Sequence, residues 1–201
     1  MAFIAKHFLN KLFSKNNVEI SHKVDVVKEL IESIKYLCKT KTGALIVRKR
    51  DLSQNTYAEV GTKLDALLST ELLLTIFHTN TPLHDGAVIL KGDRIISAGA
   101  LLPLTEDPKL SWKYGTRHRA AIGMTEVSED ACLVVSEETG EVSMAVDGIL
   151  RKYEDIKVLK EDLEKILNSF PGVHIFVSCF ITNLFNFGNK LPSGKYSLNG
   201  T

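Results

Sequence analysis

The chain of 201 residues has little of several features that would assign it to a specialised class of protein. It contains only three cysteines, Cys38, Cys132 and Cys179, which are far apart and include no Cys-x-x-Cys pair. This argues against a disulfide framework or a zinc knuckle. No stretch approaches the roughly 20 apolar residues of a membrane-spanning helix, and the first residues lack the cleavage site of a secretory signal. We therefore expect a soluble protein, without a transmembrane segment, in a reducing cytoplasm.

Excess charge of either sign is also missing, because 25 Lys and Arg residues are balanced by 24 Asp and Glu residues. A protein that binds nucleic acid non-specifically normally carries a strong positive balance, so we expect no nucleic-acid partner. Any anionic ligand must then be bound by local groups. Hydrophobic residues make up 44% of the chain, which is enough for a core, and the length suits one compact domain with an appendage.

The sequence does contain a clear change of pattern near residue 40. Apolar residues at helical spacing predict an amphipathic helix within residues 3–15 and a second helix within residues 24–37. After residue 43, short apolar runs alternate with turns, which predicts strands at 44–47, 87–90, 95–101, 131–135, 142–146 and 149–153. Further helices are expected at 69–77, from 116 onward and at 154–169, and a closing strand with a frayed tail is expected after residue 170.

Two pairs of neighbouring strands are predicted to form hairpins. Lys91-Gly92-Asp93-Arg94 suits a tight connection, and Asp147-Gly148 is a strong type I′ turn signal. The expected fold class is therefore α/β, of the α+β type, with a mixed, largely antiparallel twisted sheet flanked by helices and preceded by two N-terminal helices. The expected parts are a helical regulatory or oligomerisation segment (1–40), the main domain (41–170), and a C-terminal strand and flexible tail (171–201).

Three polar segments follow or precede apolar runs and are the candidates for chemistry. They are His84-Asp85-Gly86-Ala87, Gly115-Thr116-Arg117-His118-Arg119 and Ser136-Glu137-Glu138-Thr139-Gly140. The second suits phosphate oxygens, because it predicts a helix N-terminus capped by Thr116 and followed by arginine side chains. In the first, Asp85 can accept a hydroxyl proton or bind a metal, and the carboxylates of the third suit a divalent cation. Taken singly, each has a plain alternative, namely a basic helix start, a tight Asp-Gly turn or a solvated charged turn.

The segments TPLHDGAVIL, LPL, GTRHRAAIG and SEETG, in this order and at these distances, resemble the DisA_N diadenylate cyclase domain. The resemblance covers residues 43–169. The two helices expected before the domain make the chain most similar to the soluble, CdaS-type cyclases of spore-forming bacilli. We accordingly expect neither the three transmembrane helices of the CdaA form nor the helical spine and DNA-binding domain of DisA.

The resemblance implies an enzyme that condenses two ATP molecules into cyclic di-AMP and two pyrophosphates. It implies a homo-oligomer, with two subunits facing each other for catalysis and a hexamer as the larger assembly. By the same resemblance, Asp85 activates the attacking 3′-hydroxyl within a catalytic group of Asp85, Gly86, Ala87 and Arg119. The implied ATP-binding residues are Gly86, Leu101, Leu102, Gly115, Thr116, Arg117, His118, Arg119, Ser136 and Glu137. His84 and Glu138 are the implied ligands of a divalent metal ion, Mn²⁺ or Mg²⁺, with Co²⁺ as a third option.

Several alternatives stay open at this point. Leu101 and Leu102 are either adenine contacts or ordinary core leucines. The N-terminal helices limit productive pairing, anchor the chain at a membrane surface, or simply pack on the domain. The rivals to an enzyme are an ATP-binding sensor that cannot pair its sites and an assembly protein.

Overall fold

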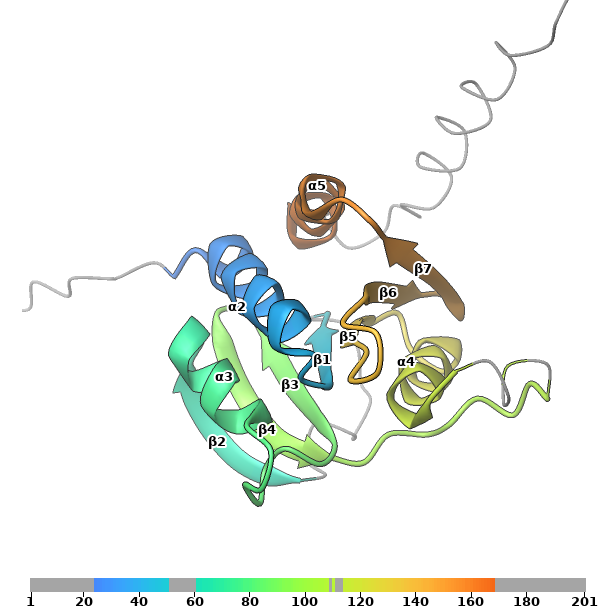
Figure 1. Cartoon of the computed structure of the whole chain (residues 1–201), viewed down its shortest axis with the longest axis horizontal. Helices are drawn as coiled ribbons and strands as arrows, with labels where there is room; N and C mark the ends of the chain where they lie inside the picture. The colour runs from blue at the N-terminus through green and yellow to red at the C-terminus, as the bar shows by residue number, and fades with distance from the viewer. Residues whose placement is uncertain (1–23, 51–60, 109, 111–113, 169–201) are drawn as a thin grey trace, which may run out of the picture.

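The structure, a computed structural model, describes residues 24–50, 61–108, 110 and 114–168. These residues form a seven-stranded sheet in the order β2-β4-β3-β1-β5-β6-β7, flanked by helices (Figure 1). The helices are α2 (Val26–Thr40), α3 (Thr70–Phe77), α4 (Thr116–Glu126) and α5 (Ile156–Asn168). The strands are β1 (Ala44–Lys49), β2 (Thr62–Leu67), β3 (Ala87–Lys91), β4 (Arg94–Ala100), β5 (Ala131–Val135), β6 (Val142–Val146) and β7 (Ile149–Tyr153).

The predicted mixed and largely antiparallel sheet is confirmed. Strand β1 pairs parallel with β3 and antiparallel with β5, and the other four pairs are antiparallel. The predicted type I′ turn between β6 and β7 is confirmed by positive φ angles at Asp147 (50°) and Gly148 (74°). Strand β2 was not predicted. The helix expected within residues 3–15 and the strand and tail expected after residue 170 lie outside the described residues.

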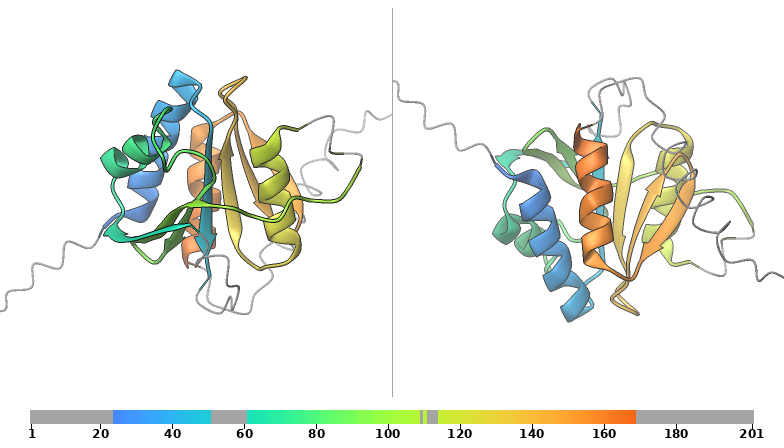
Figure 2. Two further views of the ribbon diagram at one scale, coloured as in Figure 1. Left: turned by 90° about the horizontal axis from the view of Figure 1, so that it is seen from below. Right: turned by 90° about the horizontal axis from the view of Figure 1, so that it is seen from above.

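The sheet is covered on both faces, by α2, α3 and α5 on one side and α4 on the other (Figure 2). Alternate residues of β1 therefore enter two separate cores. Ala44 and Ile46 belong to the larger core beneath the three helices, and Leu45 and Val47 belong to the smaller core beneath α4. Burial on both faces explains why this strand has a continuous apolar run instead of an alternating pattern.

Helix α2 is part of the larger core, although the sequence analysis assigned its residues to a separate segment ending at residue 40. It begins after Asp25, whose side chain accepts a hydrogen bond from a first-turn amide, and it ends at Lys41 in the left-handed conformation. Leu30, Ile34 and Leu37 are each at most 1% exposed and share the core with residues of the sheet. The helix therefore contributes directly to the stability of the sheet domain.

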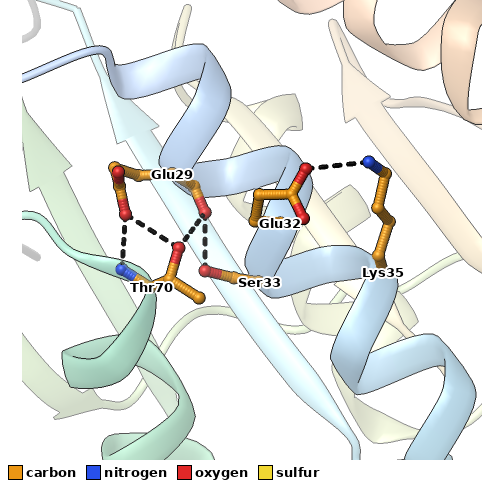
Figure 3. Close-up of polar contacts among 5 residues, drawn as sticks. All are labelled: Glu29, Glu32, Ser33, Lys35 and Thr70. Atoms are coloured by element: carbon orange, nitrogen blue, oxygen red, sulfur yellow. Dashed lines mark hydrogen bonds and ion pairs between the residues drawn. The ribbon is translucent and has the colours of Figure 1, made fainter.

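A carboxylate of α2 also fixes the start of α3 (Figure 3). Glu29 Oε2 accepts hydrogen bonds from the backbone N and the Oγ1 of Thr70, each at 2.7 Å. The preceding residue, Ser69, is the N-cap of the helix, and its side chain accepts a hydrogen bond from the backbone N of Leu72. A negative charge at a helix N-terminus is favoured by the helix dipole. The neighbouring pair of Glu32 and Lys35 in the same view is exposed and adds little.

Strand β2 is the outermost strand on one side of the sheet, and it is irregular. Its register against β4 shifts between Lys63 and Ala66, and Asp65 at the irregularity has a φ of 51°. The carboxylate of Asp65 accepts a hydrogen bond from Arg94 Nε at 2.7 Å, which holds the irregular segment against β4. The edge is therefore bent and charged.

Candidate functional site

Sheet topology brings two of the three predicted polar segments, together with residues 101–102, to the edge of the sheet at which β1 and β3 begin and β4 and β5 end. Ile46 is opposite Val88 in the parallel β1–β3 pair, so both strands begin at this edge. Ala44 is opposite Val135 in the antiparallel β1–β5 pair, so β5 ends there. Strand β4 ends at the same edge, because Ala100 is opposite the first residue of β3. The segments 84–86, 101–102 and 136–138 are consequently neighbours although they are far apart in the sequence.

A cleft of about 500 Å³ lies between the start of α4, the β5–β6 turn and strands β6 and β7. This volume is within the range typical of small-molecule sites. The cleft is lined by Tyr114, Gly115, Thr116, Arg117, His118, Val135, Ser136, Glu137, Glu138, Thr139, Glu141, Ser143, Leu150 and Lys152. It therefore unites seven of the predicted site residues, namely Gly115 to His118 and Ser136 to Glu138.

The remaining predicted residues do not line this cleft. Asp85 is exposed at the start of β3, and Leu101 is 71% exposed after β4, so Leu101 is not a core leucine. Leu102 is half-buried and packs against the smaller core. The chain then runs along α4, where the backbone N of Thr105 donates to the carbonyl of Arg119 at 3.1 Å. The roles of these residues stay predictions.

The predicted N-cap residue of α4 was wrong. Gly115, and not Thr116, is the N-cap, and it makes no side-chain hydrogen bond to the helix. Thr116 is instead the first helical residue. A helix start without a side-chain cap leaves the first-turn amides without a capping partner, and because these residues line the cleft, their amides and the helix dipole favour an anion there.

Two arginines of α4 add positive charge to this helix start. Arg117 Nη1 forms an ion pair of 2.6 Å with Glu137 Oε2, which joins α4 to the β5–β6 turn. The Nε atoms of Arg117 and Arg119 are buried and have no hydrogen-bond partner among the described residues. A buried, unpaired N–H of a cation is costly. The arrangement therefore suits a ligand that brings several acceptor oxygens, as a phosphate group does.

Three residues that were not predicted, Tyr114, Glu141 and Lys152, also line the cleft and interact with the predicted ones. Burial lowers the pKa of His118, and the carboxylates of Glu138 and Glu141 oppose only part of this shift. Lys152 of β7 donates to Glu141, and this hydrogen bond lowers the pKa of the Glu141 carboxyl. The ring of Tyr114 lies 5.5 Å from that of His118, measured between centroids. No short motif marks these positions, because only the pairing of β6 with β7 brings Lys152 to the cleft.

The two residues predicted to bind a metal, His84 and Glu138, are suitable ligands, but two protein ligands alone do not complete a metal site. The described residues contain no group of three or more His, Cys, Asp or Glu side chains that could hold an ion. The Nδ1 atom of His84 lies 2.6 Å from the carbonyl oxygen of Thr81, and because that oxygen can only accept, Nδ1 donates. The Nε2 atom of a neutral imidazole is then an acceptor, which is the usual state of a metal-binding histidine. Glu138 is exposed on the β5–β6 turn, so a cation between them would need further oxygens from a ligand.

Gly86 is required by the backbone itself. Its φ is +117°, and a Cβ there would lie 2.7 Å from the carbonyl carbon of Gly99 and 2.9 Å from the carbonyl oxygen of Ala100. An L side chain would therefore be strained and would collide with β4. This glycine lets β3 and β4 approach each other next to Asp85.

Comparisons with known proteins agree with this arrangement. Residues 31–150 match the DAC family, described as DisA bacterial checkpoint controller nucleotide-binding. The cyclic di-AMP synthase CdaA of Bacillus subtilis (strain 168) is 43% identical over 155 residues, which are 77% of this chain and 57% of CdaA. The diadenylate cyclase CdaS of Bacillus thuringiensis (strain BMB171) is 48% identical over 118 residues, which are 59% of each protein. This chain thus spans less than two thirds of either relative.

Solved structures give the same result for the fold. The crystal structure of a double mutant of DacA from Staphylococcus aureus is similar with a TM-score of 0.69 and 40% identity, covering 71% of this chain and 95% of the chain in that crystal structure. Within the part of this chain that the structure describes, no helix has both the length and the apolar character needed to cross a membrane. Because the family match extends over more than half of the sequence and the fold agrees, the chain belongs to the DAC family of DisA-type nucleotide-binding domains.

Proposed function

We propose that the chain is a diadenylate cyclase, which condenses two ATP molecules into cyclic di-AMP and two pyrophosphates. The observation that carries this proposal is that the segments before β3 and after β5 lie at the same end of their strands, with the start of α4 joined to the second by the Arg117–Glu137 ion pair, in a chain of the DAC family. The names of the relatives, cyclic di-AMP synthase and diadenylate cyclase, support the same reaction.

The triphosphate of ATP is expected to bind at the start of α4. First-turn amides and the guanidinium groups of Arg117 and Arg119 would neutralise its charge. Ser136 and Glu137 would form the opposite wall. The adenine would contact Leu101, whose exposure leaves it accessible, and Leu102. Gly86 and Ala87 would lie against the ribose.

In the reaction, Asp85 takes the proton of a ribose 3′-hydroxyl as the oxygen attacks the α-phosphorus of a second ATP. The new bond joins the 3′-oxygen to this phosphorus, the bond from the phosphorus to the bridging oxygen of the β-phosphate breaks, and pyrophosphate leaves with the bond electrons. In the second transfer, the 3′-hydroxyl of the second nucleotide attacks the α-phosphorus of the first, which closes the ring and releases the second pyrophosphate. Asp85 is exposed and does not line the cleft. It is therefore accessible to a nucleotide held by a second, facing subunit, which supports a role at the junction of two nucleotides.

Two copies of the chain must therefore face each other, and we propose a catalytic dimer within a larger homo-oligomer such as a hexamer. The segment before α2 is proposed to restrain this pairing. A strand and a flexible tail are proposed for residues 171–201. Cys38 and Cys132 are free thiols, which supports the cytoplasmic setting that we propose.

A divalent cation is part of the proposal, held by His84, Glu138 and phosphate oxygens. It would supply positive charge that stabilises the charge developing on the phosphates. An imidazole ligand favours Mn²⁺ over Mg²⁺, and Co²⁺ is the third candidate.

The test is to incubate the purified chain with ATP and Mn²⁺ and to identify the products by mass spectrometry. Asp85→Asn should lower cyclic di-AMP formation by about 10²–10⁴-fold, the usual loss of a general base, while ATP still binds. The matched control is Asp147→Asn, which removes the same charge from another Asp-Gly pair. Asp147 lies in the β6–β7 turn, at the ends of the strands opposite to the site. Asparagine is equally suited to this turn. Full activity of Asp85→Asn would refute the role of Asp85, and ATP binding by the unaltered chain without any product would refute the cyclase proposal.

A further inference from the structure

Gly43 is a buried residue between α2 and β1 that belongs to none of the predicted motifs. Its φ lies outside the left-handed region that favours glycine, so its backbone would accept an alanine. Any requirement for glycine at this position must therefore come from its neighbours. Those neighbours are two side chains of the cleft.

The ion pair of Arg117 and Glu137 lies directly against Gly43. A Cβ at residue 43 would be 2.8 Å from Glu137 Oε2 and 2.9 Å from Arg117 Cζ, and closer still to Arg117 Nη1. These are the groups that form the 2.6 Å ion pair. The space left by the missing side chain is thus the space that the ion pair occupies.

Residue 43 cannot easily move away from this contact. On one side, the backbone N of Thr42 donates to the carbonyl of Leu37 at 2.9 Å, which anchors the segment to the end of α2. On the other side, Ala44 begins β1 and is opposite Val135 of β5, directly before the turn that carries Glu137. The same turn touches α2, because a Cβ on Gly140 would lie 3.5 Å from the backbone carbon of Cys38. Residue 43 is therefore held on both sides by hydrogen-bonded elements.

We propose that Gly43 is a positioning residue. Its missing side chain lets the guanidinium of Arg117 lie against the α2–β1 connection, paired with Glu137, where it can contact the triphosphate. The identity of the ligand rests on the proposed function. The three atoms nearest to an added methyl group all belong to the ends of two flexible side chains. Gly43→Ala should therefore preserve the fold while it shifts the guanidinium.

A double-mutant cycle tests this inference without relying on turnover. Isothermal titration calorimetry would measure the Kd of the α,β-methylene analogue of ATP, with Mn²⁺, for the unaltered chain, Gly43→Ala, Arg117→Ala and the double variant. Gly43→Ala should weaken binding by about tenfold, the effect of one displaced charge-assisted hydrogen bond. In the Arg117→Ala background the same change should alter binding by less than about twofold, since the methyl group then fills vacated space.

Thermal unfolding of all four chains would show that the fold is retained. Equal losses in both backgrounds would overturn the inference, because a general structural effect does not depend on Arg117, and so would an unchanged Kd for Gly43→Ala. Should Gly43→Ala not fold, Glu137→Gln breaks the same ion pair, and unweakened binding by that variant would overturn the inference as well. Because the analogue cannot release pyrophosphate, this result is separate from the test of cyclic di-AMP synthesis.

Discussion

Removal of α2 should prevent folding of the sheet domain, and the structure gives the magnitude. Leu30 and Ile34 are 0% exposed and Leu37 is 1% exposed within the larger core. Truncating one such side chain to alanine costs about 2–5 kcal/mol, so losing all three costs about 6–15 kcal/mol. This equals the entire free energy of unfolding of a typical domain, about 5–15 kcal/mol. A chain that begins at residue 41 should therefore not fold.

The assay compares the whole chain with chains that begin at residue 24 and at residue 41, by urea titration followed with far-UV circular dichroism. The chain from residue 24, which keeps α2, should show a cooperative transition, and the chain from residue 41 should show none. Within α2, Ile34→Ala should lower the free energy of unfolding by about 2–5 kcal/mol, while Tyr36→Ala, at a position 53% exposed, should change it little. A chain from residue 41 that unfolds at the original midpoint would refute the reasoning.

Four further variants probe individual residues of the domain. Glu29→Gln should lower the free energy of unfolding by about 1–2 kcal/mol in urea titrations, because the charge at the start of α3 is lost and the bond to the N of Thr70 weakens. Asp162→Ala should cost about 3–5 kcal/mol, since the buried carboxylate accepts from Arg151 at 2.8 Å and from Tyr153 at 3.0 Å, whereas Tyr153→Phe should cost only about 1 kcal/mol. Burial lowers the pKa of His118, so the unfolded chain binds the proton more tightly and stability should fall as the pH drops below 6.5. His118→Asn should flatten that decline in pH-dependent thermal unfolding, and an unchanged slope would contradict the assignment.

Most helices and strands could be predicted from the sequence because burial imposes their patterns. The apolar run at β1 and the Asp147-Gly148 turn are examples, since each is fixed by local chemistry. Strand β2 escaped prediction because its exposed, charged residues form no run, and only pairing with β4 makes it a strand. A sequence pattern contains no information on such a partner.

The candidate site shows the same division between local and long-range information. The basic start of α4 was predicted from its composition, but the choice of Gly115 over Thr116 as the N-cap depends on the path of the chain into the helix. The ion pair between Arg117 and Glu137 joins residues twenty positions apart, and it could not be derived from either segment. Lys152 enters the cleft only through the register of β7 on β6.

The irregular edge of the sheet at β2 has a consequence for how copies of the chain can associate. An open sheet exposes backbone donors and acceptors at its outer strand, and a straight, apolar strand there invites another chain to extend the sheet. The kink at Asp65, its clamp to Arg94 and the charge of Lys63 obstruct such growth. A second copy of the chain would therefore have difficulty extending the sheet at this border.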